Sequence, residues 1–189
     1  EMYSIDPVLF KWSAAHLRKL PPGRLKRIRM FKGHMVFGLH EVLSRPATYI
    51  TVLRDPVDRV ISAFYFMRSY KLHPLYWKLR RNNWTLEDFV CRYHQRDNVQ
   101  AKVVAGSEDE APCTPEILEK AKQNLGRHFS VVGLSERLEE SLALMKLRFG
   151  WKFATYSSFN VTRSRPRKGD LPKVSLDLTR EKNSFDVEL

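Results

Sequence analysis

Residues 49–66 constrain the fold of this chain more than any other stretch. The stretch begins with an apolar, β-branched run at residues 49–53, whose length and composition predict a buried strand. Pro56 follows where the first residue of a helix needs no backbone N–H, and the apolar residues after it recur at helical spacing. The stretch therefore predicts a strand, a tight turn and a helix in direct succession.

The turn between this strand and helix carries Arg54. Free N–H groups and the helix dipole favour an anion at a helix N-terminus, and the donor fork of an arginine suits a phosphate. Arg59 and Ser62 are three residues apart and share one face of the helix. These residues predict a phosphate site. The alternative is that Arg54 pairs with Asp55 or Asp58 and only holds the turn, while Ser62 only packs.

The rest of the chain repeats the alternation of strand and helix. Further strands are predicted at residues 35–39 and 129–134, and helices at 7–20, 56–70, 85–93, 114–126, 135–149 and from about 176 onward. This alternation predicts one domain over residues 1–189, a three-layer α/β/α fold with a largely parallel sheet. Ligands of such folds bind outside the C-terminal ends of the strands, where Arg54 lies. Residues 163–172 are polar and basic, which predicts a mobile loop.

Charge restricts the partners of this chain. The net charge of +12 and the pI near 9.9 favour a polyanion: nucleic acid, an acidic glycan, a phosphonucleotide or an anionic membrane surface. Nucleic acid is disfavoured because no helix-turn-helix, zinc-finger or RNA-binding signature is present. A P-loop kinase is disfavoured because the Gly-x-x-x-x-Gly-Lys-Ser/Thr loop is missing. The two cysteines, Cys91 and Cys113, lack the spacing of metal ligands, and no metal site is predicted.

Residues 54–66 resemble a known motif. Their pattern, Arg-Asp-Pro-x-x-Arg-x-x-Ser-x-x-Tyr-Phe, is similar to the 3′-phosphate-binding element of carbohydrate sulfotransferases of the sulfotransferase family 2 type. The likeness is to the uronosyl/heparan sulfate 2-O-sulfotransferase branch and its bacterial relatives. Weaker likenesses follow in the same order along the chain at residues 32–38, 97–106, 129–138 and 160–163. The resemblance implies that Arg54 and Ser62 hold the 3′-phosphate of 3′-phosphoadenosine-5′-phosphosulfate (PAPS), and that Arg59 belongs to the same motif.

The resemblance also implies a reaction, the transfer of a sulfuryl group from PAPS to a hydroxyl of a carbohydrate acceptor, which includes acidic glycans, without a metal. His34 matches the Gly-His position of the family and is the expected general base, because a neutral imidazole accepts a proton near neutral pH. His40 is the second choice. Arg163 and Arg165 are expected either to bind the substrate or to form a basic tail.

The family resemblance further implies a Pro-Lys-x-Gly-Thr-Thr-like loop after an N-terminal strand, which binds the 5′-phosphosulfate. No such loop occurs in residues 1–189. The expectation is a P-loop NTPase-like sulfotransferase fold without its N-terminal strand and loop, as a fragment incomplete at both ends. The alternative is a catalytically inactive homologue that binds nucleotide or polyanion. A eukaryotic protein would lie on the lumenal side of the Golgi membrane and a bacterial one in the cytoplasm, and no membrane anchor is recognisable in this sequence.

Overall fold

The computed structural model describes residues 17–43, 45–93, 97–107, 112–152, 162 and 165–189, and the backbone of residues 2–4. The strands are β1 (Met2–Ser4), β2 (Met30–Lys32), β3 (Tyr49–Leu53) and β4 (Phe129–Leu134). The α-helices are α2 (Pro22–Arg27), α3 (Pro56–Ser69), α4 (Tyr76–Arg81), α5 (Leu86–Arg92), α6 (Val99–Ala105), α7 (Pro115–His128), α8 (Leu138–Phe149), α9 (Lys173–Lys182) and α10 (Ser184–Glu188). Three 3-10 turns are η1 (Leu39–Val42), η3 (Ser135–Arg137) and η4 (Lys168–Asp170).

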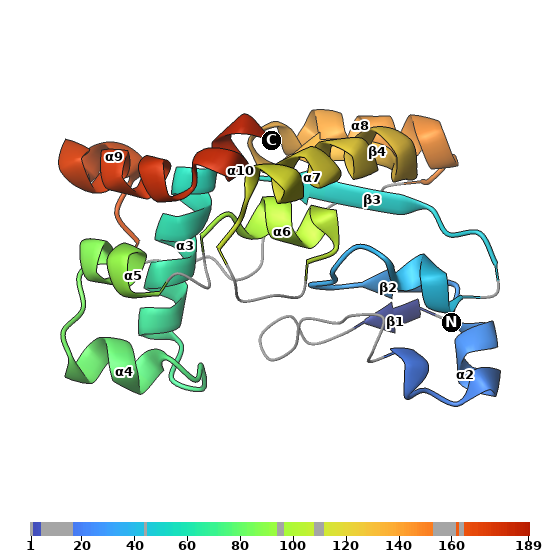
Figure 1. Cartoon of the computed structure of the whole chain (residues 1–189), viewed down its shortest axis with the longest axis horizontal. Helices are drawn as coiled ribbons and strands as arrows, with labels where there is room; N and C mark the ends of the chain where they lie inside the picture. The colour runs from blue at the N-terminus through green and yellow to red at the C-terminus, as the bar shows by residue number, and fades with distance from the viewer. Residues whose placement is uncertain are drawn as a thin grey trace.

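The described strands form two parallel pairs. β3 lies beside β4, with Thr51 opposite Val132 and Leu53 opposite Leu134, and β1 lies beside β2 (Figure 1). Parallel neighbours need a long crossover, which α3 to α7 provide between β3 and β4. The predicted α/β class and the parallel pairing are confirmed, although the described strands make two separate pairs and not one continuous sheet.

The helix after β3 forms as its sequence predicts. Asp55 is the N-cap, and its Oδ1 accepts a 2.7 Å hydrogen bond from the Asp58 N–H, while Pro56 occupies the first helical position. Apolar residues at helical spacing, Ile61 and Phe64 among them, form the buried face. The helix therefore has a fixed start, which places the preceding turn and Arg54 at the C-terminal end of β3.

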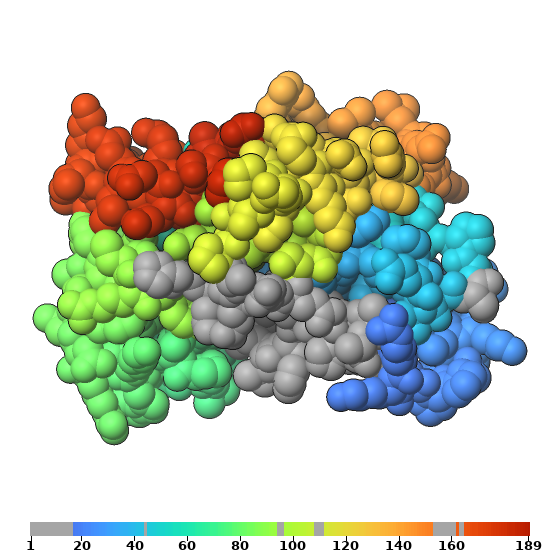
Figure 2. All heavy atoms as spheres, viewed as in Figure 1, coloured from blue at the N-terminus to red at the C-terminus, as the bar shows by residue number. Residues whose placement is uncertain are grey.

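Two groups of buried side chains hold this arrangement. The first lies between α3, α4 and α5, where Phe64, Leu79 and Phe89 are almost inaccessible to solvent. The second lies between α6 and α7 and consists of small residues, Ala101 and Ala121 among them, which let the two helices approach closely. The C-terminal helices α9 and α10 lie against α5 and α6. In Figure 2 the red C-terminal segment lies above the green of α5 and borders the yellow of α7.

The predicted strand at residues 35–39 is wrong. The strand lies earlier, at β2, and residues 39–42 form the turn η1. Gly33 and Gly38 have φ angles of 145° and 107°, which interrupt an extended run on both sides. Between them Met35 makes an isolated β-bridge, and the Phe37 N–H donates to the Val103 carbonyl of α6, 2.9 Å away, so the segment does not continue as a strand.

Other boundaries differ in smaller ways. β3 and β4 were predicted as buried, yet Val52 and Leu134 are 41% and 44% exposed, because each strand has only one partner strand among the described residues. The chain makes the turn η3 before α8 begins, and the helix α4 was not predicted. The final helical region begins at Lys173 and is divided into α9 and α10. Most of the predicted helix at residues 7–20 lies outside the described residues.

Candidate functional site

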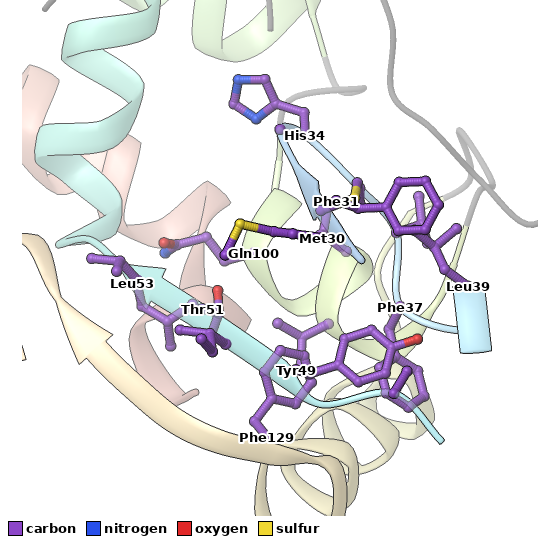
Figure 3. Close-up of a pocket in the computed structure, with 18 of the residues that line it drawn as sticks. Met30, Phe31, His34, Phe37, Leu39, Tyr49, Thr51, Leu53, Gln100 and Phe129 are labelled. Carbon is purple, nitrogen blue, oxygen red and sulfur yellow. The ribbon is translucent and has the colours of Figure 1, made fainter. Parts of the chain in front are cut away.

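A cleft of about 1110 Å³ lies between β2 with its following loop and the segment formed by β3 and α3 (Figure 3). His34, Arg54, Arg59 and Ser62 all line it. Arg54 lies at the C-terminal end of a strand, as the sequence predicted, and the structure brings all four side chains to one cavity. Clefts of this size are typical of nucleotide and cofactor sites.

The backbone of Arg54 is held by the side chain of Gln100. The Arg54 N–H donates to Gln100 Oε1 at 2.8 Å, and Gln100 Nε2 donates to the Arg54 carbonyl at 2.9 Å. Gln100 lies in the first turn of α6, so one amide group joins α6 to the turn after β3. Both backbone groups of Arg54 are satisfied in this way, which fixes the direction in which its side chain leaves the turn.

The guanidinium of Arg54 contacts a carboxylate on the helix that follows. Arg54 Nε donates to Asp58 Oδ2 at 2.8 Å, and its NH2 group also contacts this oxygen. Arg165 forms an ion pair with the other oxygen of Asp58. This is the pairing that the alternative interpretation of the sequence named. Asp58 therefore holds two arginines, and the three side chains together carry one excess positive charge.

Arg165 is poorly solvated in this arrangement. Burial and the nearby guanidinium of Arg54 lower the pKa of Arg165 from its usual value. Its Nε atom is buried and has no hydrogen-bond partner within the described residues. A second acceptor near Arg54 and Arg165, such as an oxygen of a phosphate, would satisfy that donor and reduce the repulsion between the two guanidinium groups.

The basic segment after residue 162 is attached to the same turn. Lys168 Nζ lies 3.0 Å from Asp55 Oδ1, and the Asp55 N–H donates to Glu136 Oε1 at 2.9 Å. Residues 168–170 form the turn η4. The segment was predicted as a mobile loop, but within its described part Arg165 and Lys168 are both held by aspartates of the Arg54 turn.

Arg59 lies on the inner face of α3 beside a buried carboxylate. Its Nε is 3.8 Å from Asp186 Oδ2, and Asp186 also accepts hydrogen bonds from the N–H groups of Gln100 at 3.1 Å and Ala101 at 2.7 Å. Asp186 thus satisfies the N-terminus of α6 from the C-terminal helix α10. Burial raises the pKa of Asp186 above its usual value, and the Arg59 charge with these N–H groups offsets only part of that effect.

His34 and His40 occupy different surroundings in the cleft. His34 is exposed, on the loop after β2, and in Figure 3 it lies at the opposite end from Phe37, Tyr49 and Phe129. His40 is half-buried, and its Nδ1 is 2.8 Å from the hydroxyl of Tyr49. The ring of Phe37 contacts both, with centroid distances of 5.2 Å to His40 and 4.8 Å to Tyr49. His34 is therefore the histidine that a solvent-borne acceptor can reach.

Arg163 lies outside the described residues. Arg165 does not line the cleft. It contacts Asp58, which in turn contacts Arg54 in the cleft wall. Within the described ranges no group of three or more His, Cys, Asp or Glu side chains is placed to hold a metal ion. None of the helices in these ranges is both long enough and apolar enough to span a bilayer.

The local sequence around Gln100 and around Asp186 predicts no functional role for either residue. Gln100 lies in residues 97–106, which resemble a segment of the sulfotransferase family. The hydrogen-bond partner of Gln100 is Arg54, which is 46 residues away. Asp186 is 86 residues from Gln100. No local sequence pattern connects residues at such separations. The sequence offers one signal, which is that Gln100 is a polar residue at the start of a largely apolar helix.

The family and the relatives that this chain resembles are all sulfotransferases. The galactose-3-O-sulfotransferase family matches residues 7–189. The galactosylceramide sulfotransferases of Bos taurus and Mus musculus are each 29% identical, over 168 and 170 residues, covering 82% of this chain and 38% of the relative. Galactose-3-O-sulfotransferase 2 of Mus musculus is 23% identical over 134 residues, covering 65% of this chain and 32% of the relative. The chain thus spans about two fifths of the length of the galactosylceramide sulfotransferases.

Proposed function

The chain belongs to the galactose-3-O-sulfotransferase family, and we propose that it forms part of an enzyme that transfers a sulfuryl group from PAPS to a carbohydrate hydroxyl. The observation that carries the proposal is the convergence of Arg54, Arg59, Ser62 and His34 on one cleft. A phosphate site and a proton acceptor are the two functions that these side chains suit.

The residues present fit the 3′-phosphate end of the donor. The cleft volume of about 1110 Å³ exceeds what a nucleotide of this size needs. Arg54 lines the cleft, and it shares the carboxylate of Asp58 with Arg165, so the three side chains leave one excess positive charge at the wall that a phosphate dianion approaches. We propose that Arg54 and Ser62 bind the 3′-phosphate. Arg59 lines the same wall of the cleft, on the face of α3 that carries Ser62. The sequence has no Pro-Lys-x-Gly-Thr-Thr-like turn, so no residue is assigned to the 5′-phosphosulfate.

When bound, PAPS supplies a sulfuryl group attached to a phosphate that leaves readily. A bond forms between the acceptor oxygen and sulfur, and the bond between sulfur and the 5′-phosphate oxygen breaks. The acceptor hydroxyl loses its proton in this step, and His34 is the proposed acceptor of that proton. Its exposure on the loop after β2 leaves room for a sugar to approach the ring.

The acceptor is proposed from the family. The matched family and the relatives named above point to the 3-hydroxyl of a galactose residue, carried by a glycan or by a lipid such as galactosylceramide. The expected class, a carbohydrate sulfotransferase, is supported. The comparisons do not confirm the likeness to the uronosyl 2-O branch, and they favour galactose over a uronic acid as the acceptor.

Three finer expectations also remain proposals. The P-loop NTPase-like form of the fold agrees with the parallel strands and with a ligand cleft at the C-terminal end of β3. The bovine and murine relatives fit the Golgi alternative better than the bacterial cytoplasmic one. Arg163 remains a proposed substrate-binding residue, as does Arg165 through its contact with Asp58.

The decisive experiment is a calorimetric titration of 3′-phosphoadenosine-5′-phosphate into the chain at fixed, moderate salt. Adenosine-5′-phosphate, which lacks the 3′-phosphate, is the control ligand. Arg54→Ala and Ser62→Ala should each weaken binding of the 3′-phosphorylated nucleotide by about tenfold or more, because charge-assisted bonds to a phosphate are lost. The matched control is Arg127→Ala, which removes an exposed arginine at the end of α7.

Each result has a clear meaning. A preference for the 3′-phosphorylated nucleotide that depends on Arg54 supports the proposed site. Equal affinity for both nucleotides, or equal losses in the Arg54 and Arg127 variants, would refute the assignment of the 3′-phosphate. A third result is possible when PAPS and a galactoside are supplied to the full-length protein. Specific nucleotide binding without turnover would favour the alternative, a catalytically inactive homologue that binds nucleotide.

A further inference from the structure

The span of sequence that contains α4 is basic and has no acidic residue. The sequence has no Asp or Glu between Asp58 and Glu87, and within this span Lys71, Lys78, Arg80 and Arg81 are exposed. In Figures 1 and 2, α4 forms a corner of the molecule, at the lower left. Such a concentration of positive charge attracts an anionic surface.

Two large apolar side chains project from the same region. Leu72, in the turn before α4, is 76% exposed, and Trp77, in the first turn of α4, is 58% exposed. The guanidinium of Arg81 lies over the Trp77 ring, 5.4 Å from its centroid, and holds the ring beside the basic side chains. The buried side of α4 is supplied by Tyr76 and Leu79. The exposed leucine and tryptophan are therefore not needed for the core.

This combination distinguishes a bilayer from a soluble polyanion. A charged polymer in water is bound by basic groups and stacks its bases on an exposed indole ring, but it gives no reason to expose a leucine tip beside them. At a membrane interface, tryptophan lies at the level of the headgroups, a leucine reaches the acyl boundary, and Lys and Arg contact anionic headgroups.

The surface also adjoins the cleft. Phe66 and Met67 on α3 and His73, the residue after Leu72, all line the cavity that contains Arg54. A bilayer that touched Leu72 and Trp77 would therefore lie next to one wall of the proposed site. An acceptor sugar attached to a lipid projects only a short distance from the bilayer surface, so the enzyme must bring its cleft close to that surface.

We infer that Leu72 and Trp77, with Lys71, Lys78, Arg80 and Arg81, form a docking surface for anionic lipid bilayers. This membrane-docking surface rests on the proposed function, because it places the cleft beside a lipid-linked galactose. Its chemistry requires no lipid anchor and no spanning helix, since shallow apolar insertion and several basic groups act together.

The test is sedimentation of the chain with vesicles of phosphatidylcholine alone or mixed with phosphatidylserine. Binding should require phosphatidylserine, and Leu72→Glu should weaken it about tenfold or more, through loss of apolar insertion and added repulsion. Lys71→Glu combined with Arg80→Glu is a second variant, which leaves both apolar side chains in place. The matched control is Leu147→Glu, because Leu147 is 83% exposed on α8 and also lies beside basic residues.

The inference is overturned if the Leu72 and Leu147 variants bind vesicles equally well, or if Leu72→Glu weakens binding of soluble heparin as much as binding of vesicles. Titration with 3′-phosphoadenosine-5′-phosphate separates this inference from the proposed function. Vesicle binding can fail while the nucleotide still binds, or persist while the nucleotide does not. A normal nucleotide affinity in the variants also shows that they are folded.

Discussion

The side-chain amide of Gln100 pairs with both backbone groups of Arg54, accepting from its N–H at 2.8 Å and donating to its carbonyl at 2.9 Å. The pairing joins the N-terminus of α6 to the turn after β3. It ties the orientation of the proposed phosphate-binding arginine to a helix that does not itself carry the arginine. Gln100 is therefore a positioning residue for Arg54.

Gln100→Ala should weaken binding of 3′-phosphoadenosine-5′-phosphate about tenfold, because two hydrogen bonds that direct Arg54 are lost. Affinity for adenosine-5′-phosphate should stay unchanged, since the lost contacts serve the 3′-phosphate alone. Gln100→Glu should show the same pattern, because an ionised carboxylate cannot donate to the Arg54 carbonyl. Gln123→Ala, on the exposed side of α7, is the control for calorimetry. Equal losses for both nucleotides would show a general structural effect.

Asp58→Asn tests whether Asp58 competes with the phosphate for Arg54 and Arg165. The substitution removes the negative charge that both guanidinium groups contact. We expect the 3′-phosphorylated nucleotide to bind about three to ten times more tightly at low salt, since less of the positive charge is neutralised. The gain should shrink as salt rises. Weaker binding at every salt concentration would instead show that Asp58 is needed to orient Arg54.

His34→Ala should abolish sulfuryl transfer in the full-length protein and leave the affinity for 3′-phosphoadenosine-5′-phosphate nearly unchanged, because the proposed general base acts on the acceptor and not on the nucleotide. His40→Ala is the comparison, since its ring is hydrogen-bonded to Tyr49 within the aromatic side chains. Turnover with a galactoside acceptor is the measurement. Loss in the His40 variant with activity kept in the His34 variant would reverse the assignment.

Asp186 should make stability depend on pH in a specific direction. Its pKa in the folded chain is raised above the usual 3.8 by burial, so the folded state binds this proton more tightly than the unfolded state does. This contribution to stability is complete below the usual pKa and is lost as pH rises through the raised pKa. An asparagine side chain at this position cannot ionise, so in urea unfolding the stability of Asp186→Asn relative to the native chain should increase as the pH rises above the usual Asp pKa of 3.8 and through the raised pKa. A constant difference would refute the raised pKa.

Gly133 should tolerate no side chain. A Cβ atom there would lie 2.7 Å from Ser141 Cβ, and the Ser141 hydroxyl is itself fixed by bonds to Leu134 and Arg137. Gly133→Ala should therefore lower the free energy of unfolding by about 1–3 kcal/mol in a denaturant titration. Gly126→Ala is the control, because nothing lies within 4 Å of its added Cβ inside α7, and it should stabilise the chain by about 0.5–1 kcal/mol. A neutral Gly133 variant would show that α8 shifts readily.

The strand, turn and helix around Arg54 could be predicted because their signals are local. A β-branched run, a proline at the first helical position and an aspartate cap act within a few residues of one another. The same holds for the capping box of Thr85 and Asp88, which begins α5 as predicted. The predicted strand at residues 35–39 failed because its outcome depended on two glycine φ angles and on a bond to α6.

The sequence alone therefore determined the strand, turn and helix around Arg54 and the residue types of the proposed phosphate site, because the strand and helix periods and the Arg54 motif lie in adjacent residues. The tertiary structure alone decided which partners those residues meet. Gln100 and Asp186 come from segments far along the chain, and Arg165 reaches Arg54 through Asp58 across 107 residues. Such contacts depend on how helices pack, and packing is a property of the whole fold that no short stretch of sequence specifies.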